Sequence, residues 1–338
     1  MTVSSIRFAA VAVAAAAAVA TAIAQSSGTV AAALASRQHP LAALPIVARI
    51  PVPVGPGWLA TGFGSVWLSK SESHEVLRID PATNGVVAII PVGRDPELGI
   101  GIGLGSVWIA DPKDRSLTQI DPKTNRVVRT VSVNLPDETE GSIGVGEGGI
   151  WLLTNEQGTD SGTLSRVDPV SGKVTANIRV RPKSHAALVA FHAVWVTSTG
   201  AGSVSRIDPR TNAVVAEIPV HSAPRFLSAG AGSIWVLHQG DGTLARIDPA
   251  TNRVQAIVDV GVPGDGGDLT VAADAVWVSG EGVPLSQIDP RTNRLTRQFV
   301  GGKKDDTLRV GYGAAWVVDE LQGQIWKVDL GKLARMRP

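Results

Sequence analysis

Residues 232–261 read GSIWVLHQGDGTLARIDPATNRVQAIVDVG, and this stretch decides the fold. We interpret it as three short strands, at 233–237, 243–248 and 254–260, with an inner strand just before it at 227–229. Glycines at 230 and 232 mark the first tight turn, and Asp-Pro-Ala-Thr-Asn at 248–252 marks the last. The stretch therefore predicts a unit of four strands joined by short connections.

The same unit occurs seven times along the chain. Each copy has a short apolar strand that contains Trp, followed by a strand that ends on Asp, and successive Trp residues lie 39 to 44 positions apart. A period near forty residues with four strands per unit is typical of a β-propeller, in which each blade buries its faces against its neighbours. We therefore predict an all-β, seven-bladed β-propeller of four-stranded blades. The periodic residues are Trp67, Trp108, Trp151, Trp195, Trp235, Trp277 and Trp316.

The repeated acidic residues are interpreted as turn residues rather than catalytic ones. Five units carry Asp-Pro-x-Thr-Asn after the third strand, and the third unit carries Asp168-Pro169-Val170-Ser171-Gly172 instead. Because Asn and Gly replace each other at the last position, we expect a positive φ there. Pro fixes the φ of the first corner, and Asp and Thr can bond nearby backbone N–H groups.

The ring is expected to close with a strand from the N-terminal side. The last unit supplies only three strands, whereas an additional strand at 46–52 precedes the first unit and resembles the fourth strands elsewhere. We predict that this N-terminal strand completes the seventh blade, which removes exposed sheet edges. Deletion of the chain past Pro53 should then destabilise the whole ring.

The N-terminal residues are predicted to be a targeting signal. Arg7 precedes an apolar run of 13 residues at 8–20, and Ala22-Ile23-Ala24 matches a signal-peptidase site. The run is short for a membrane span, which needs about 20 residues; an uncleaved anchor is the alternative. We expect a signal peptide at 1–24 cleaved after Ala24, a flexible spacer at 25–44, the propeller at 45–330 and a tail at 331–338. The mature chain would be secreted or periplasmic, without a membrane span.

Composition excludes several classes of function. The net charge of +1 offers no basic field for nucleic acid. The absence of Cys excludes disulfides, thiolate catalysis and Cys-ligated metals. No nucleotide-binding loop, serine-hydrolase elbow or His pair at metal-ligand spacing is found in the sequence. We expect a monomer that is stabilised by packing alone.

Two of the units show a resemblance to known families. GSVWIADPKDRSLTQIDPKTNRVVRTVSV at 105–133 and the stretch at 232–261 resemble the YVTN-type propeller repeats of exported bacterial proteins and the related repeats of streptogramin B lyase. The resemblance covers nearly the whole mature chain and implies the fold. It implies little about function, because one fold hosts many functions.

The resemblance to the lyase also implies a site, which this chain does not match. In that family a Glu-x-His precedes one inner strand, and a second metal-binding Glu follows the Trp of the same blade by three residues. The counterpart of the His is His185, but Lys183 and Ser198 stand at the two Glu positions. An ammonium group cannot replace a carboxylate as a ligand of Mg²⁺.

The candidate site is the mouth of the propeller, the face that carries two kinds of connection. One joins the second and third strands of a blade, and the other joins a fourth strand to the next inner strand. Loops from all blades converge there, as at small-molecule sites in such folds. Trp58 and Phe226 each lie nine residues before a periodic Trp, so both should border the opening. The candidate ligand-binding residues are Trp58, Lys183, His185, Arg225, Phe226, His238, Asp268, Asp306 and Arg309.

Three features of the mouth allow sharper hypotheses. Asp95, Glu97 and Asp111 place three carboxylates in one blade, which suits Ca²⁺ or Mg²⁺, although solvated loop acids are the alternative. Arg309 interrupts an apolar inner strand and needs an acidic partner such as Asp268, either as a structural ion pair or as a ligand anchor. His185 and His238 are the candidate general acids or bases, if they are not simply exposed.

We therefore expect an exported, rigid binding module for a small molecule, peptide or partner protein, and not an enzyme. The alternative is a metal-assisted lyase or hydrolase that uses the mouth carboxylates and a His. A structural protein of the cell envelope is the third hypothesis.

Overall fold

A computed structural model describes residues 34–55, 57–70, 72–94, 96, 99–133, 143–155, 162–262, 264, 266–272, 274–302 and 307–336. The chain divides into two compact units, Met1–Gln38 and His39–Pro338. The predicted signal peptide lies outside the described residues.

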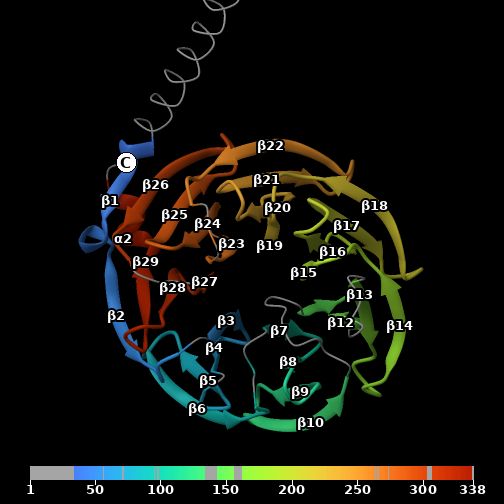
Figure 1. The fold of residues 1–338 in the computed structure, drawn as a ribbon. Helices are drawn as coiled ribbons and strands as arrows, with labels where there is room; N and C mark the ends of the chain where they lie inside the picture. The colour runs from blue at the N-terminus through green and yellow to red at the C-terminus, as the bar shows by residue number, and fades with distance from the viewer. Residues whose placement is uncertain are drawn as a thin grey trace, which may run out of the picture. The chain divides into compact units, whose positions relative to one another are not determined.

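The second unit is the predicted propeller. Its strands form separate antiparallel sheets of neighbouring strands, and these sheets surround a common centre as seven blades (Figure 1). The first four blades are β3 (Gly57–Gly62), β4 (Ser65–Lys70), β5 (Glu75–Asp80) and β6 (Gly85–Pro91); β7 (Ile100–Gly103), β8 (Ser106–Asp111), β9 (Ser116–Asp121) and β10 (Arg126–Ser132); β11 (Ile143–Gly146), β12 (Gly149–Asn155), β13 (Gly162–Val167) and β14 (Val174–Arg179); β15 (Ser184–Ala190), β16 (Ala193–Ser198), β17 (Ser203–Asp208) and β18 (Ala213–Pro219).

The fifth to seventh blades complete the ring. They are β19 (Pro224–Gly230), β20 (Ser233–His238), β21 (Thr243–Asp248) and β22 (Arg253–Asp259); β23 (Leu269–Ala272), β24 (Ala275–Gly280), β25 (Val283–Asp289) and β26 (Arg294–Val300); β27 (Leu308–Gly311), β28 (Ala314–Asp319), β29 (Gln324–Asp329) and β2 (Ile46–Pro51). The N-terminal strand β2 pairs antiparallel with β29, with Ile50 opposite Ile325. The predicted closure of the ring is therefore confirmed.

Short elements on both sides of this closure were not expected from the sequence. β1 (Gln38–Pro40) is a fifth strand beside β26, and the 3-10 turn η1 (Leu41–Ala43) leads to the buried Leu44. At the other end, α2 (Leu330–Arg335) packs its buried Leu333 into the same cluster as Leu44.

The periodic Trp residues are buried between neighbouring blades. Trp67, for example, packs with Ile90 of its own blade and with Ile100 and Val107 of the next. In all seven blades the indole Nε1–H donates to the carbonyl oxygen five residues earlier, where the innermost strand ends, at 2.9–3.2 Å. The Trp therefore holds the turn between the first two strands and fills the space between two blades.

The Asp-Pro turns have the predicted conformation. Asn84, Asn125, Asn212, Asn252 and Asn293 have φ between 54° and 59°, and Gly172 in the third unit has a φ of 70°. The Asp carboxylate accepts a hydrogen bond from the N–H two residues on, as at Asp248 and Ala250 (2.9 Å). This backbone donor holds the pKa of Asp248 below its usual range. The repeated acids are turn residues.

These turns also join neighbouring blades through a cation, an arrangement that we call the turn clasp. The Arg78 guanidinium lies 5.1 Å from the Trp67 ring and donates to Pro122 O (2.6 Å) and Asn125 Oδ1 (2.7 Å) of the next blade. In the last blade Lys327 makes the same bonds to the first blade, to Pro81 O (2.6 Å) and Asn84 Oδ1 (2.9 Å). The same stacking on a periodic Trp occurs at Arg166, Arg206 and Arg246.

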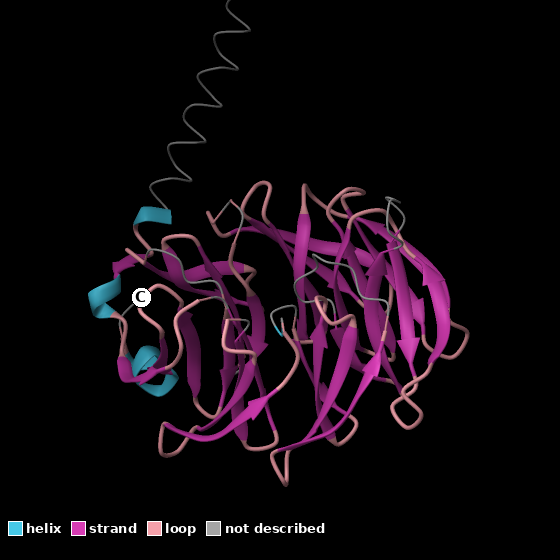
Figure 2. Cartoon of the chain, turned by 60° about the horizontal axis from the view of Figure 1, so that its bottom comes forward, coloured by secondary structure: helices cyan, strands magenta, loops and turns pink. Residues whose placement is uncertain are grey.

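In the second and sixth blades an Arg of the fourth strand makes the contact, to the third blade and to the C-terminal segment after β29, respectively. Arg129 donates to the carbonyl oxygens of Pro169 and Val170, and Arg297 donates to those of Leu333 and Met336. The Asp-Pro turns and the turns between the first two strands of each blade lie on one face of the ring, which we call the turn face. The strands run between the turn face and the mouth (Figure 2).

Candidate functional site at the mouth

Two aromatic rings from opposite parts of the ring meet at the mouth. Trp58 on β3 belongs to the first blade and Phe226 on β19 to the fifth, yet their ring centroids are 5.6 Å apart. Both side chains are buried, at 7% and 4% exposure. The equal offset of the two residues from their periodic Trp predicted that both border the opening, because both occupy the mouth end of an innermost strand; their contact with each other was not predicted.

Each ring carries a guanidinium. Arg225 lies over Phe226 at 5.2 Å, and Arg309 lies over Trp58 at 5.4 Å. Both arginines are half-buried. An aromatic face attracts a cation and is more effective where water is excluded, so the rings form a floor that fixes both charges.

Arg309 is paired with a buried acid, as the sequence predicted. Its guanidinium contacts the carboxylate of Asp268, which also accepts hydrogen bonds from the N–H groups of Leu269 (2.7 Å) and Leu308 (3.0 Å). Burial raises the pKa of the Asp268 carboxyl, and the positive charge of Arg309 opposes that rise. The pair ties the sixth blade to the seventh.

Two neutral side chains accept hydrogen bonds from Arg225. Its Nε donates to His185 Nε2 at 2.7 Å, and its Nη1 donates to Gln239 Oε1 at 2.9 Å. The Gln239 amide in turn donates to Gly266 O at 2.7 Å. The His185 ring stands edge-on to Phe226, with centroids 5.5 Å apart.

His185 therefore acts as an acceptor in this network. Burial, with a smaller contribution from the charge of Arg225, lowers the pKa of His185 to about 3. At neutral pH the imidazole is neutral, and its Nε2 lone pair is already engaged by Arg225. This arrangement orients the guanidinium, whereas a general acid or base works best with a pKa near the operating pH.

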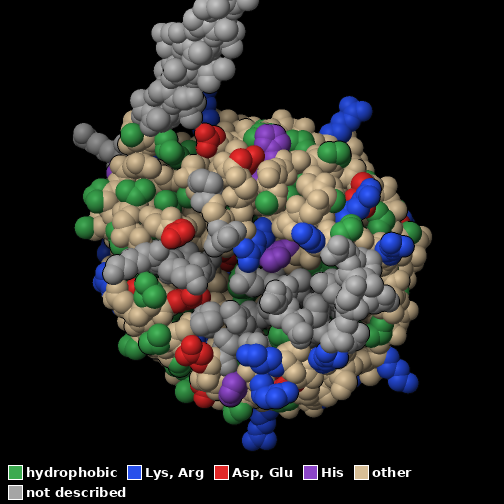
Figure 3. Space-filling model, in the orientation of Figure 1, with side chains coloured by type: hydrophobic (Ala, Val, Ile, Leu, Met, Phe, Trp, Pro, Cys, Tyr) green, Lys and Arg blue, Asp and Glu red, His purple; other side chains and the backbone are tan. Residues whose placement is uncertain are grey.

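Six predicted site residues thus form one contiguous group, which we call the mouth cluster. Lys and Arg side chains with His gather near the middle of this face, over β15 and β19 (Figure 3). Lys183 is exposed just before β15, with its side chain near Gly200. The members of the mouth cluster are Trp58, His185, Arg225, Phe226, Asp268 and Arg309.

Other predicted residues lie apart from this cluster. Asp95, Glu97 and Asp306 lie outside the described residues, so a Ca²⁺ or Mg²⁺ site there stays a prediction. Asp111 is buried at the end of β8, where it accepts a hydrogen bond from Asp114 N (2.9 Å) and lies against Gly93.

His238 is buried at the end of β20, and its ring stacks on His221 at 5.6 Å. Burial lowers the pKa of His238 to about 4, opposed by the charge of Asp241. The sequence did not single out Gln239, His221 or Asp241. Gln239 and Asp241 flank Gly240 in the loop that follows His238, and this position could have indicated them.

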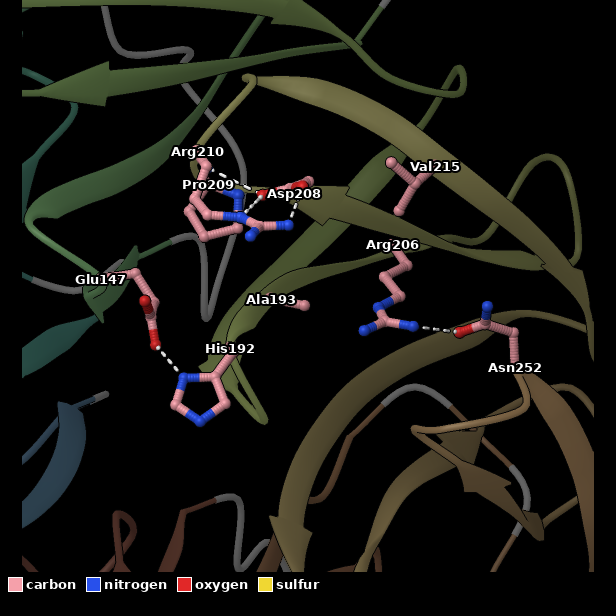
Figure 4. Close-up of a pocket in the computed structure, with 9 residues that line it drawn as sticks. All are labelled: Glu147, His192, Ala193, Arg206, Asp208, Pro209, Arg210, Val215 and Asn252. Carbon is pink, nitrogen blue, oxygen red and sulfur yellow. Dashed lines mark hydrogen bonds and ion pairs between the residues drawn. The ribbon is translucent and has the colours of Figure 1, made fainter.

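A separate cleft of about 640 Å³ lies on the turn face between the third, fourth and fifth blades (Figure 4). Its polar groups bond one another: His192 meets Glu147 at 3.1 Å, and Arg206 donates to Asn252 at 2.9 Å. Arg206 and Asn252 belong to the turn clasp, so we assign this cleft a structural origin.

Comparison with known proteins finds structures of similar fold but no similar sequence. No model of a known protein family matches the chain, and no curated protein matches its sequence. Among solved structures, virginiamycin B lyase from Staphylococcus aureus is similar with a TM-score of 0.70 and 15% identity, over 83% of this chain and 98% of that one.

Two further structures are similar over comparable lengths. Kuenenia stuttgartiensis hydrazine synthase has a TM-score of 0.65 and 12% identity, over 85% of this chain and 96% of that one. BamB from Moraxella catarrhalis has a TM-score of 0.55 and 12% identity, over 84% of this chain and 99% of that one.

Within the described residues, no helix has the length and apolar character needed to cross a membrane. The chain is a seven-bladed β-propeller with the fold of streptogramin B lyase.

Proposed function

We propose that the protein is a rigid binding module whose mouth cluster binds the carboxylate group of a small molecule or peptide. The observation that carries this proposal is the pair of guanidiniums held over the Trp58–Phe226 floor. Arginine presents planar N–H donors that match a carboxylate in geometry and charge.

The charges of the mouth cluster and of Lys183 support an anionic ligand. Lys183, Arg225 and Arg309 are cationic, whereas Asp268 is the acidic member of the cluster and is already in contact with Arg309. Because His185 is neutral at pH 7, it adds no charge of its own. The cluster members come from five different blades, so the rigid ring fixes their spacing before a ligand binds, and little ordering cost remains.

The lyase alternative has less support from the geometry. Lys183 and Ser198 stand where the resemblance requires carboxylates, and Ser198 Oγ donates to Pro182 O at 2.5 Å. The Nε2 of His185 accepts from Arg225 and is not available to take a proton from a substrate.

The test uses the full chain without a polyhistidine tag and two matched probes, N-acetylphenylalanine and its amide. We expect thermal stabilisation and calorimetric binding with the acid and not with the amide; a ligand at one hundred times its dissociation constant stabilises by about 2.7 kcal/mol. Arg225→Gln should weaken binding of the acid at least about tenfold, because it removes one charged hydrogen-bond donor.

Arg291→Gln is the matched control. Arg291 is exposed on the turn face and contacts its own turn residue Asp289 at 3.5 Å. Equal binding of acid and amide, or equal effects of the two Arg substitutions, would refute the proposal.

We also propose export through residues 1–24 and a monomeric state. Mass spectrometry of the secreted product should find Gln25 as the new N-terminus, and light scattering should give the mass of one chain. A retained Met1 or a dimer mass would contradict these points.

A further inference from the structure

A second group of side chains lies at the rim of the mouth, between the fourth and fifth blades. His221 comes from the connection between β18 and β19, His238 ends β20, and Asp241 lies in the loop that leads to β21. One ligand atom of each residue lies within 4.8 Å of the others. Two neighbouring connections at the mouth therefore bring two imidazoles and one carboxylate together.

Hydrogen bonds fix two of these groups. Asp241 Oδ1 accepts from the Thr243 hydroxyl (2.7 Å) and from Thr243 N (3.1 Å). Its other oxygen, Oδ2, lies 3.1 Å from His221 Nδ1. Thr243 Oγ1 also lies 2.9 Å from His238 Nδ1, so one hydroxyl links the carboxylate with the buried imidazole.

This link determines which nitrogen of His238 carries the proton. An ionised carboxylate only accepts hydrogen bonds, so the single hydroxyl proton of Thr243 points to Asp241. Thr243 Oγ1 must then accept from His238, and Nδ1 carries the hydrogen. The Nε2 of His238 is left with an unprotonated lone pair.

That lone pair is buried without a hydrogen-bond partner among the described residues. His238 is 0% exposed, and its Nε2 has no partner. Buried polar atoms in proteins are nearly always paired, and leaving one unpaired destabilises the fold. The atom therefore indicates a ligand at this position.

We propose that His221, His238 and Asp241 form a binding site for a divalent transition metal of the zinc class. Two imidazole nitrogens and a carboxylate oxygen are donors that such ions prefer, whereas Ca²⁺ and Mg²⁺ prefer oxygen alone. Two ligands of one tetrahedral zinc lie about 3.3 Å apart, because each bond is about 2.0–2.1 Å long. The His221–Asp241 separation of 3.1 Å already matches this value.

The surroundings resemble those of known metal sites. Metal-bound histidines almost always donate their second N–H to a fixed acceptor, which sets the tautomer and the ring orientation. The Thr243 hydroxyl has this role for His238. Because His221 and Asp241 are exposed, the fourth position of the metal faces solvent. The site is separate from the proposed carboxylate-binding residues, and its test does not depend on them.

The experiment is a calorimetric titration of Zn²⁺ into the chelator-treated, tag-free full chain. We expect one Zn²⁺ per chain, and His221→Ala and Asp241→Asn should each weaken binding at least about tenfold, as the loss of a metal-site contact does. Since both side chains are exposed, neither substitution should change the melting temperature without metal. Co²⁺ bound in place of Zn²⁺ should give the visible absorption of a tetrahedral site.

His192→Ala is the matched control. His192 also lies 3.1 Å from a carboxylate, Glu147, but among the described residues no third ligand accompanies this pair. The His192→Ala substitution should leave the affinity for Zn²⁺ unchanged. The proposal is overturned if Zn²⁺ does not bind saturably, or if His192→Ala weakens binding as much as His221→Ala does.

Discussion

The two faces of the propeller are built on opposite plans. On the turn face, a periodic Trp, a cation and an Asp-Pro turn recur from blade to blade. On the mouth, the position three residues after each periodic Trp holds six different residue types in the seven blades. The residues there are Lys70, Asp111, Thr154, Ser198, His238, Gly280 and Asp319.

This difference separates stability from recognition. Repeated contacts on the turn face fasten each blade to the next and leave little room for variation. The mouth ends of the same strands carry different side chains from blade to blade, so these side chains can serve a ligand. Substitutions on the turn face should therefore lower stability and leave binding unchanged. Substitutions at the mouth should weaken binding and leave stability largely unchanged.

The largest effect is expected at the closure of the ring. Deletion of residues 1–53 removes β2, exposes the edge of β29 and removes the buried Ile50. We expect the free energy of unfolding to fall by about 5 kcal/mol or more, a large part of a typical domain's stability. Guanidinium unfolding followed by Trp fluorescence measures this, with deletion of 1–33 as the control. Equal unfolding midpoints for the two deletions would show that β2 does not close the ring.

A periodic Trp should be next in size. Trp195 is fully buried, donates to Ala190 O at 2.9 Å and supports Arg206. Trp195→Ala should cost about 3–5 kcal/mol, as other large core deletions do. Trp195→Phe keeps most of the volume and should cost less than half as much. If both substitutions cost the same, the ring volume is not what stabilises the blade.

The turn clasp should contribute less than its Trp. Arg246 bonds Ser233 Oγ (2.9 Å) and Asn293 Oδ1 (3.0 Å) and contacts Pro290 O. Arg246→Met keeps the apolar stem and removes these charged hydrogen bonds, which should cost about 2 kcal/mol. Urea unfolding measures the loss, and binding of N-acetylphenylalanine should not change. A variant that loses binding but keeps its stability would reverse the comparison of the two faces.

The smallest effect concerns pH and the mouth. Because the folded-state pKa of His185 is about 3, the unfolded chain takes up a proton below about pH 6.5 that the folded chain does not. Stability should therefore fall as the pH decreases through this window. His185→Gln should reduce the loss between pH 7 and pH 5.5 by about 1 kcal/mol. Urea midpoints at the two pH values test this, with the exposed His192→Gln as control; a wild-type-like pH dependence of His185→Gln would contradict it.

The fold was predictable because its signals are local and repeated. The spacing of Trp gave the number of blades, and the exchange of Asn212 with Gly172 in equivalent turns gave the positive φ. The closing strand could be found because 46–52 resembles a fourth strand. β1 and α2 lack such a repeat; they occur once, and the pairing of β1 with β26 and the burial of Leu333 in α2 depend on surfaces that exist only after the ring has formed.

The site was predictable in part for the same reason. Trp58 and Phe226 share one position in the repeat, and Arg309 is a charge in an apolar strand, so both features stand out in the sequence. The bond of Arg225 to His185 and the approach of His221 to Asp241 depend on how loops of neighbouring blades meet. No spacing rule in one chain contains that information.

The closure of the ring has a consequence for how the chain could be rewired. Asp329 N donates to Pro45 O at 3.1 Å, so β29 and β2 form a hairpin that lacks only its turn. In six other blades that place is filled by an Asp-Pro turn, whereas Asp329 caps α2 by accepting from Lys332 N (2.9 Å). A chain joined at this place by Asp-Pro-x-Thr-Asn would be continuous around the ring. It could then be opened at any other blade, and the blade with which the chain begins would become a matter of choice rather than of structure.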